Sequence, residues 1–80
     1  MENDSVNHPA HYTAGKFEVI EIIESITNSM KLTPFEGYML GNTLKYLARF
    51  KHKNGLEDLQ KAKVYLDMLI KDQEDKERVR

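Results

Sequence analysis

Five side chains in the middle of the chain repeat at spacings of four, three, four and three residues: Tyr38, Asn42, Lys45, Arg49 and His52. Residues three and four apart lie on one face of an α-helix, so the spacing predicts a face with an aromatic ring, an amide, two fixed cations and an imidazole. Arginine can bind phosphate oxygens in a bidentate manner, lysine adds a point charge, and a tyrosine ring could stack on a base. The face suits a phosphorylated ligand. Solvated helix faces also contain lysine and arginine, however, and spacing alone does not choose between the two interpretations.

A second group of polar residues, Asp58, Lys61 and Tyr65, shares a face of the following segment by the same rule. Two interpretations of its charged members stay open. Asp58 and Lys61 could form only a surface ion pair, or they could position Lys45 or Arg49 from a neighbouring helix.

The N-terminal arm contains a third group, in the run Asn7-His8-Pro9-Ala10-His11-Tyr12. Two histidines three residues apart could bind a metal on a helix, but Pro9 disfavours a helix there and no nearby carboxylate completes a site. We therefore predict no metal site and no cofactor. The arm either contacts a ligand or a partner subunit, or it packs Tyr12 on the core.

Three segments with helical periodicity must position these groups. The first covers residues 16–30, where apolar side chains repeat at Val19, Ile23, Ile26 and Met30. The second begins at Thr33, which with Glu36 forms a capping box around Pro34, and it runs to about residue 53, before Asn54-Gly55.

The second segment has an apolar side distinct from its polar face, formed by Leu40, Leu44, Leu47 and Phe50. Gly37 and Gly41 share another face, where a helix crossing or a ligand would use the space that they leave. The third segment begins near Leu56, repeats apolar residues through positions 59–69, and continues into a charged tail.

Length and composition limit the class of protein. Eighty residues allow one domain, and the absence of cysteine excludes disulfides and a thiol nucleophile. No apolar run approaches the roughly 20 residues that span a bilayer, and the acidic N-terminus is not a signal peptide, so we expect an intracellular protein without membrane contact. The net charge of −1 disfavours nucleic acid as a partner, although residues 31–63 carry seven basic residues against three acids.

We therefore predict an all-α, three-helix chain with an arm (residues 1–16), a helical core (17–70) and a charged tail (71–80). A chain of this size without disulfides or a structural metal rarely has a sufficient core, and so we also expect a homo-oligomer. The alternative is a well-packed monomeric bundle. No phosphate-binding glycine loop, serine elbow or paired acidic helices are visible, so no catalytic residue is assigned.

Three motifs together resemble a family of small bacteriophage proteins, most of them of unknown function, over about residues 6–70. The motifs are Val6-Asn7-His8-Pro9-x-His11-Tyr12, Gly41-Asn42-x-x-Lys45-Tyr46-x-x-Arg49 and Glu57-Asp58-Leu59-x-Lys61-Ala62-x-x-Tyr65-Leu66. One larger relative is a phage nucleotide kinase that lacks the usual phosphate loop and acts on deoxynucleoside monophosphates. The resemblance implies a phage origin, the host cytoplasm as location, and a nucleotide ligand.

Three functions remain open on these grounds. The chain could bind a nucleotide or cyclic nucleotide and sequester a host immune signal, act as a compact nucleotide kinase, or inhibit a host protein as an interaction module. The predicted nucleotide-binding residues are Asn7, His8, His11, Tyr12, Asn42, Lys45, Tyr46, Arg49, Asp58, Lys61 and Tyr65.

Overall fold

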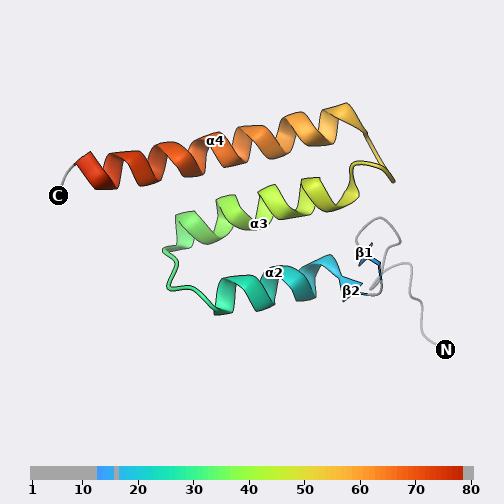
Figure 1. The fold of residues 1–80 in the computed structure, drawn as a ribbon, viewed down its shortest axis with the longest axis horizontal. Helices are drawn as coiled ribbons and strands as arrows, with labels where there is room; N and C mark the ends of the chain where they lie inside the picture. Colours follow the sequence, from blue (N-terminus) through green and yellow to red (C-terminus); the bar gives the residue numbers. More distant parts are fainter. Residues whose placement is uncertain (1–12, 16, 79–80) are drawn as a thin grey trace.

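The computed structural model describes residues 13–15 and 17–78, which fold into a short β-hairpin followed by three helices (Figure 1). The elements are β1 (Thr13–Ala14), β2 (Phe17–Glu18), α2 (Val19–Asn28), α3 (Pro34–Arg49) and α4 (Leu56–Arg78). The helices lie side by side and antiparallel, with α3 between α2 and α4 (Figure 1). The prediction of three helices is confirmed.

The first helix begins three residues later than the sequence predicts. Strands β1 and β2 pair antiparallel around Gly15, whose φ of +62° is a left-handed conformation that glycine adopts without steric cost. The helix then starts at Val19, and the Glu18 backbone N–H donates to the Glu21 carboxylate at 3.1 Å. The hairpin therefore occupies part of the segment that we predicted to be arm and helix.

The start of α3 is the capping box that the sequence predicts. The Glu36 backbone N–H donates to the Thr33 hydroxyl at 3.1 Å, and the Thr33 N–H donates to the Glu36 carboxylate at 2.8 Å. The helix ends at Arg49 rather than near residue 53, because the chain turns from Phe50 to Gly55, where the Gly55 N–H donates to the Phe50 carbonyl at 2.8 Å. Gly55 has a φ of +58°, the left-handed geometry expected at this stop.

The two glycines of α3 do not mark a tight helix crossing. A Cβ atom at Gly41 would lie 3.7 Å from the Ile23 side chain of α2, which is an ordinary van der Waals distance. At Gly37, a Cβ atom would meet no described atom within 4 Å. The close approach expected at these positions is thus limited to a normal contact between α2 and α3.

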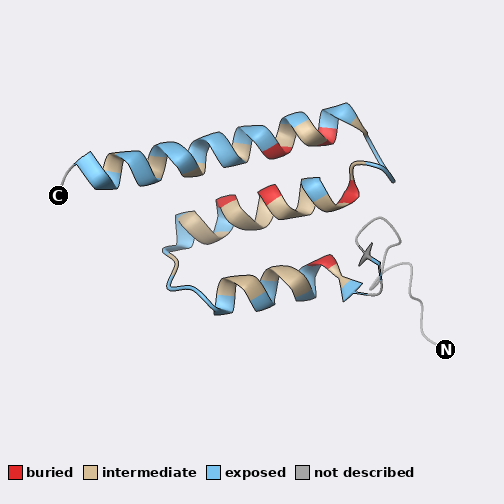
Figure 2. Ribbon diagram, viewed as in Figure 1, coloured by how far each residue is buried: buried red, intermediate tan, exposed pale blue. Residues whose placement is uncertain are grey.

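Among the described residues the three helices form a single layer, and no other helix covers either broad side of α3 (Figure 1). The buried side chains lie along the lines where neighbouring helices meet (Figure 2). Among the described residues these are three apolar and three polar side chains: Val19, Met39, Ala62, Thr43, Arg49 and Asp58. Large apolar side chains remain exposed on all three helices. Within the part of the chain that the structure describes, no helix has the length and apolar character needed to cross a membrane.

Glu36 ties the start of α3 to the C-terminal half of α4. Its carboxylate accepts hydrogen bonds from Gln73 at 2.6 Å and from Lys76 at 3.0 Å, in addition to the Thr33 N–H. The backbone hydrogen bond from Thr33, with those from Gln73 and Lys76, lowers the pKa of Glu36 from 4.5 to about 2. These bonds favour the ionised carboxylate, so they stabilise the fold while Glu36 is charged.

This contact predicts a loss of stability in acid. Because the pKa of Glu36 is lower in the folded chain than in the unfolded chain, its contribution is complete above pH 4.5 and is lost as the pH falls towards about 2. We expect the urea midpoint of the wild type to fall more steeply over this range than that of Glu36→Gln. Glu74→Gln, a change at an exposed carboxylate of α4, is the matched control and should follow the wild type. Parallel curves for the wild type and Glu36→Gln would contradict the assignment.

Candidate functional site

A buried ion pair joins the end of α3 to the start of α4. The Arg49 guanidinium donates to the Asp58 carboxylate from Nε at 3.3 Å and from Nη2 at 3.2 Å. Asp58 is completely buried and Arg49 is 6 % exposed. Asn54, in the turn between the helices, donates its backbone N–H at 3.1 Å and its side-chain amide at 3.4 Å to the same carboxylate.

These donors decide the charge state of Asp58. Burial acts to raise the pKa of the Asp58 carboxyl, but the Asn54 N–H and the Arg49 guanidinium outweigh it and hold that pKa below 3.8. Asp58 thus stays ionised and fixes the Arg49 side chain. Of the two interpretations left open above, the positioning of Arg49 by Asp58 is the one that the structure contains. Lys61 instead pairs with Glu57 at 3.6 Å.

Three cationic groups surround the ring of Tyr46. The Lys45 ammonium lies 4.6 Å from the ring centroid, the Arg49 guanidinium carbon 4.7 Å and the Lys61 ammonium 5.6 Å. At these distances each cation is attracted by the quadrupole of the aromatic ring. Residues from two helices are therefore brought together at one point.

A cluster of three tyrosines continues from this point along the line where α3 and α4 meet. The Tyr65 ring of α4 stacks on Tyr46 with centroids 5.8 Å apart and an interplanar angle of 12°. Tyr38 makes an edge-on contact with Tyr65, in which the ring centroids are 6.1 Å apart and the interplanar angle is 79°. The proximity of Tyr38, together with burial, raises the pKa of Tyr65 above 10.0. Tyr38 itself is 60 % exposed, so a flat ligand can reach its ring.

The two lysines differ in their acidic neighbours. The Lys61 side chain is 41 % exposed, and its ammonium forms an ion pair with the Glu57 carboxylate. Among the residues that the structure describes, no carboxylate lies within ion-pair distance of Lys45. A half-buried ammonium without a counter-ion, beside two further cations, is a favourable position for an anionic group.

The structure brings together six of the predicted site residues: Lys45, Tyr46, Arg49, Asp58, Lys61 and Tyr65. We call this cluster, together with Tyr38, the tyrosine–lysine site. The Arg49 side chain does not lie on a solvated face, because Asp58 draws its guanidinium into the junction of α3 and α4.

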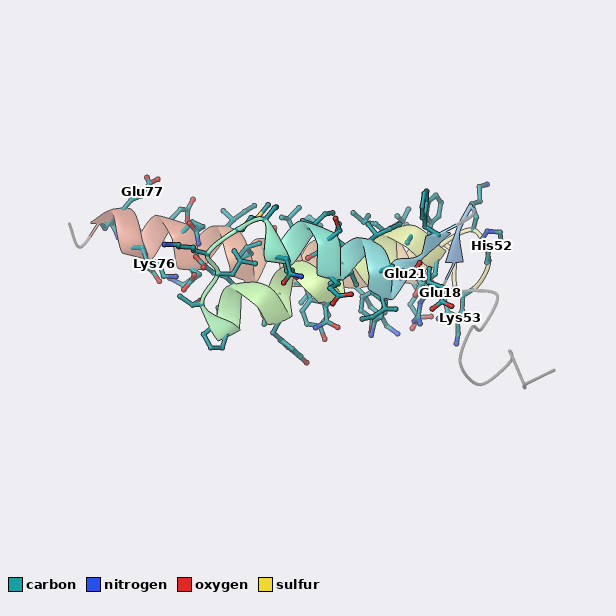
Figure 3. The ribbon with its side chains drawn as sticks, turned by 90° about the horizontal axis from the view of Figure 1, so that it is seen from below. Glu18, Glu21, His52, Lys53, Lys76 and Glu77 are labelled. Atoms are coloured by element: carbon teal, nitrogen blue, oxygen red, sulfur yellow. The ribbon has the colours of Figure 1, made fainter. Side chains whose placement is uncertain are left out.

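Among the described residues, Asn42 and His52 take no part in these ring and ion-pair contacts. The Asn42 side chain donates to the Tyr38 carbonyl of its own helix at 2.9 Å. His52 lies beyond the end of α3, where it is exposed next to Lys53 at one end of the molecule (Figure 3). Four predicted residues of the arm lie outside the described residues: Asn7, His8, His11 and Tyr12.

Asn54 is a contributor that the sequence reasoning missed. The Asn54-Gly55 pair predicts the end of a helix, and that prediction holds, but the same asparagine also donates two hydrogen bonds that stabilise the ionised Asp58 carboxylate. The spacing of four residues between Asn54 and Asp58, across a helix start, was the available signal.

Comparison with curated proteins identifies two phage relatives. The chain is 43 % identical over 70 residues to the "Gene 1.7 protein" of Enterobacteria phage T3, which covers 82 % of this chain and 42 % of that protein. It is 40 % identical over 72 residues to the "Nucleotide kinase gp1.7" of Escherichia phage T7, covering 85 % of this chain and 36 % of the relative. The chain thus spans about two fifths of the length of these relatives.

Comparison with solved structures finds no significant match. A family model described as "Protein of unknown function (DUF3310)" matches residues 6–67. This match covers most of the chain and includes every described residue of the tyrosine–lysine site. The chain therefore belongs to the DUF3310 family and is related to the nucleotide kinase of phage T7.

Proposed function

We propose that this phage protein binds a nucleotide at the tyrosine–lysine site, as a homo-oligomer. The observation that carries the proposal is the convergence of Lys45, Lys61 and Arg49 on the one ring of Tyr46. The two ammonium groups are at most about 10 Å apart, because both lie close to the same centroid. They could therefore bind one phosphate chain from two helices.

The phosphates and the base of the nucleotide would occupy different positions along the line where α3 and α4 meet. Phosphate oxygens bind at Lys45 and Lys61, while the exposed ring of Tyr38 offers a surface on which a base can stack. Asp58 acts indirectly, by holding Arg49 beside Tyr46 so that its positive charge stays near the phosphates. The arm residues Asn7, His8, His11 and Tyr12, and Asn42 of α3, complete the proposed set.

Two uses of a bound nucleotide follow from this proposal. One is sequestration, in which the protein would hold a host immune signalling nucleotide without changing it. The other is phosphate transfer, which is favoured by the 40 % identity to a protein named nucleotide kinase. Phosphate transfer requires a donor and an acceptor nucleotide, and we expect their two sites to lie on different copies of the chain.

A thermal-shift panel of mononucleotides, cyclic di- and trinucleotides and NAD-derived nucleotides tests the binding proposal directly. We expect at least one class to raise the melting temperature. Incubation of that ligand with a labelled triphosphate then separates the two uses, since only a kinase transfers the label. If no nucleotide changes the melting temperature, the proposal is wrong, and inhibition of a host protein becomes the better explanation.

The arm offers a separate test of the proposed set. Deletion of residues 1–12 should weaken binding of the nucleotide found in the panel more than it lowers the melting temperature, because four of the proposed ligand contacts are removed. Calorimetric titration and thermal unfolding of the same variant provide the comparison. A collapse of the melting temperature would instead assign the arm a structural role and confine the site to α3 and α4.

A further inference from the structure

The layer of helices has a second broad side, opposite the tyrosine–lysine site. Helical residues nine positions apart point in opposite directions, because each residue turns the helix by about 100°. Leu47 is nine residues after Tyr38 on α3, and Ile70 is nine residues after Lys61 on α4. We call this opposite side the leucine face; its members are Leu40, Leu44, Leu47, Leu66 and Ile70.

The leucine face is apolar and only partly covered. Leu47 is 45 % exposed, Leu66 42 % and Ile70 45 %. A groove of about 260 Å³ indents the same face near the start of α3, where Met30, Leu32, Leu40 and Leu69 line it. A chain with three buried apolar side chains among its described residues gains more from covering this face than from leaving it in water.

We propose that the leucine face is the interface with a second copy of this chain. In a two-fold pair the same face meets itself, so it must be free of unpaired charge at its centre. Lys63 at its edge is already paired with Asp67 at 2.8 Å, and Glu36 beside the groove is held by Gln73 and Lys76. Glu74, one turn after Ile70, is exposed towards the C-terminal end of the face. The centre of the contact, around Leu47 and Leu66, therefore buries no lone charge.

The area of this side of the layer is large enough for an interface with a second copy of the chain. A 16-residue helix is about 24 Å long, and three helices packed 8–10 Å apart are about 28 Å wide, so the whole broad side that carries the leucine face, α2 included, projects roughly 700 Å². This is close to the roughly 800 Å² per partner of a standard stable interface. The proposal rests on the homo-oligomer of the proposed function but not on its ligand. Joined in this way, the pair leaves both tyrosine–lysine sites on its outer surfaces.

Two matched substitutions on α4 test the interface. Ile70→Glu places a carboxylate on the leucine face, whereas Met68→Glu places one about 200° away around the helix. Both side chains are 45 % exposed, so neither change disturbs the core, and each new glutamate stands four residues before an existing acid, Glu74 or Asp72. By light scattering we expect the wild type and Met68→Glu at an even multiple of 9.3 kDa, and Ile70→Glu at half that mass or less.

Several outcomes would overturn the proposal. A monomeric wild type would mean that the leucine face binds another protein instead. If Met68→Glu dissociates the protein, whether or not Ile70→Glu also does, the interface lies on the opposite side.

A second measurement keeps the test valid if a glutamate variant fails to fold. The chain has no cysteine, so Ile70→Cys and Met68→Cys each carry one thiol. Maleimide labelling of Ile70→Cys should be slow at high protein concentration and fast on dilution, and that of Met68→Cys should be fast throughout. Equal labelling rates at every concentration would also refute the interface.

The failure of this interface can be distinguished from the failure of the nucleotide site. If the wild type forms the pair but responds to no nucleotide, the ligand proposal is wrong while the interface stands. If a monomeric wild type binds a nucleotide, the interface is wrong while the site stands.

Discussion

Arg49→Ala is expected to lower the free energy of unfolding by about 3–5 kcal/mol, the usual cost of removing one partner from a buried ion pair. The substitution leaves the completely buried Asp58 carboxylate without its guanidinium, and Asn54 is then the one described residue that still donates to it. In a chain of this size the core rarely supplies more than about 3–5 kcal/mol, so this variant should be largely unfolded at 25 °C. Urea denaturation followed by circular dichroism measures the effect.

Two further variants separate lost charge from lost packing. Lys71→Ala is the matched control, since Lys71 is paired with Asp75 but its side chain is 71 % exposed, and an exposed pair contributes at most about 1 kcal/mol. Arg49→Met combined with Asp58→Leu removes both charges and keeps apolar volume, so it should recover much of the stability that Arg49→Ala loses. A result in which Arg49→Ala and Lys71→Ala unfold alike would show that the ion pair does not support the fold.

Lys45→Ala and Lys61→Ala are each expected to weaken nucleotide binding by about ten- to 150-fold, the effect of one charge-assisted hydrogen bond to phosphate. These lysines test the phosphate site better than Arg49, because neither belongs to the buried ion pair and their loss should leave the urea midpoint nearly unchanged. Calorimetric titration with the nucleotide found in the panel gives the affinities.

The control for both lysines is Lys63→Ala. Lys63 lies on α4, its side chain is 74 % exposed and it pairs with Asp67 away from the tyrosine cluster. If all three alanine variants bind alike, the lysines of the tyrosine–lysine site do not contact phosphate, and only the relationship to a nucleotide kinase would still favour a nucleotide.

Local chemistry made much of α3 and α4 predictable from sequence. The capping box of Thr33 and Glu36 satisfies backbone N–H groups within four residues, so it needs no tertiary contact to be recognised. The separation of polar and leucine faces follows in the same way from the helical repeat. Lys45 and Arg49 lie on one helix and Lys61 on the next. Their proximity could be predicted only on the assumption that the two helices pack side by side.

The remaining features depend on contacts between distant segments. A hairpin with two residues in each strand is too short to show alternation, so the late start of α2 had no signal. The burial of Arg49 could not be deduced from its own helix, because Asp58 lies on the next one and Asn54 in the turn between them. The stacking of Tyr65 on Tyr46 likewise depends on how α4 crosses α3.

The position of α3 between the other two helices has a consequence for local unfolding. Helix α2 packs against α3 and makes little contact with α4, and it carries none of the residues of the tyrosine–lysine site (Figure 1). Segments held by few contacts open first, and they can do so while the rest of a protein stays folded. A chain in which α2 has detached would therefore keep Tyr46 between its three cations, so the exchange of α2 between docked and open forms need not interrupt the occupation of the site.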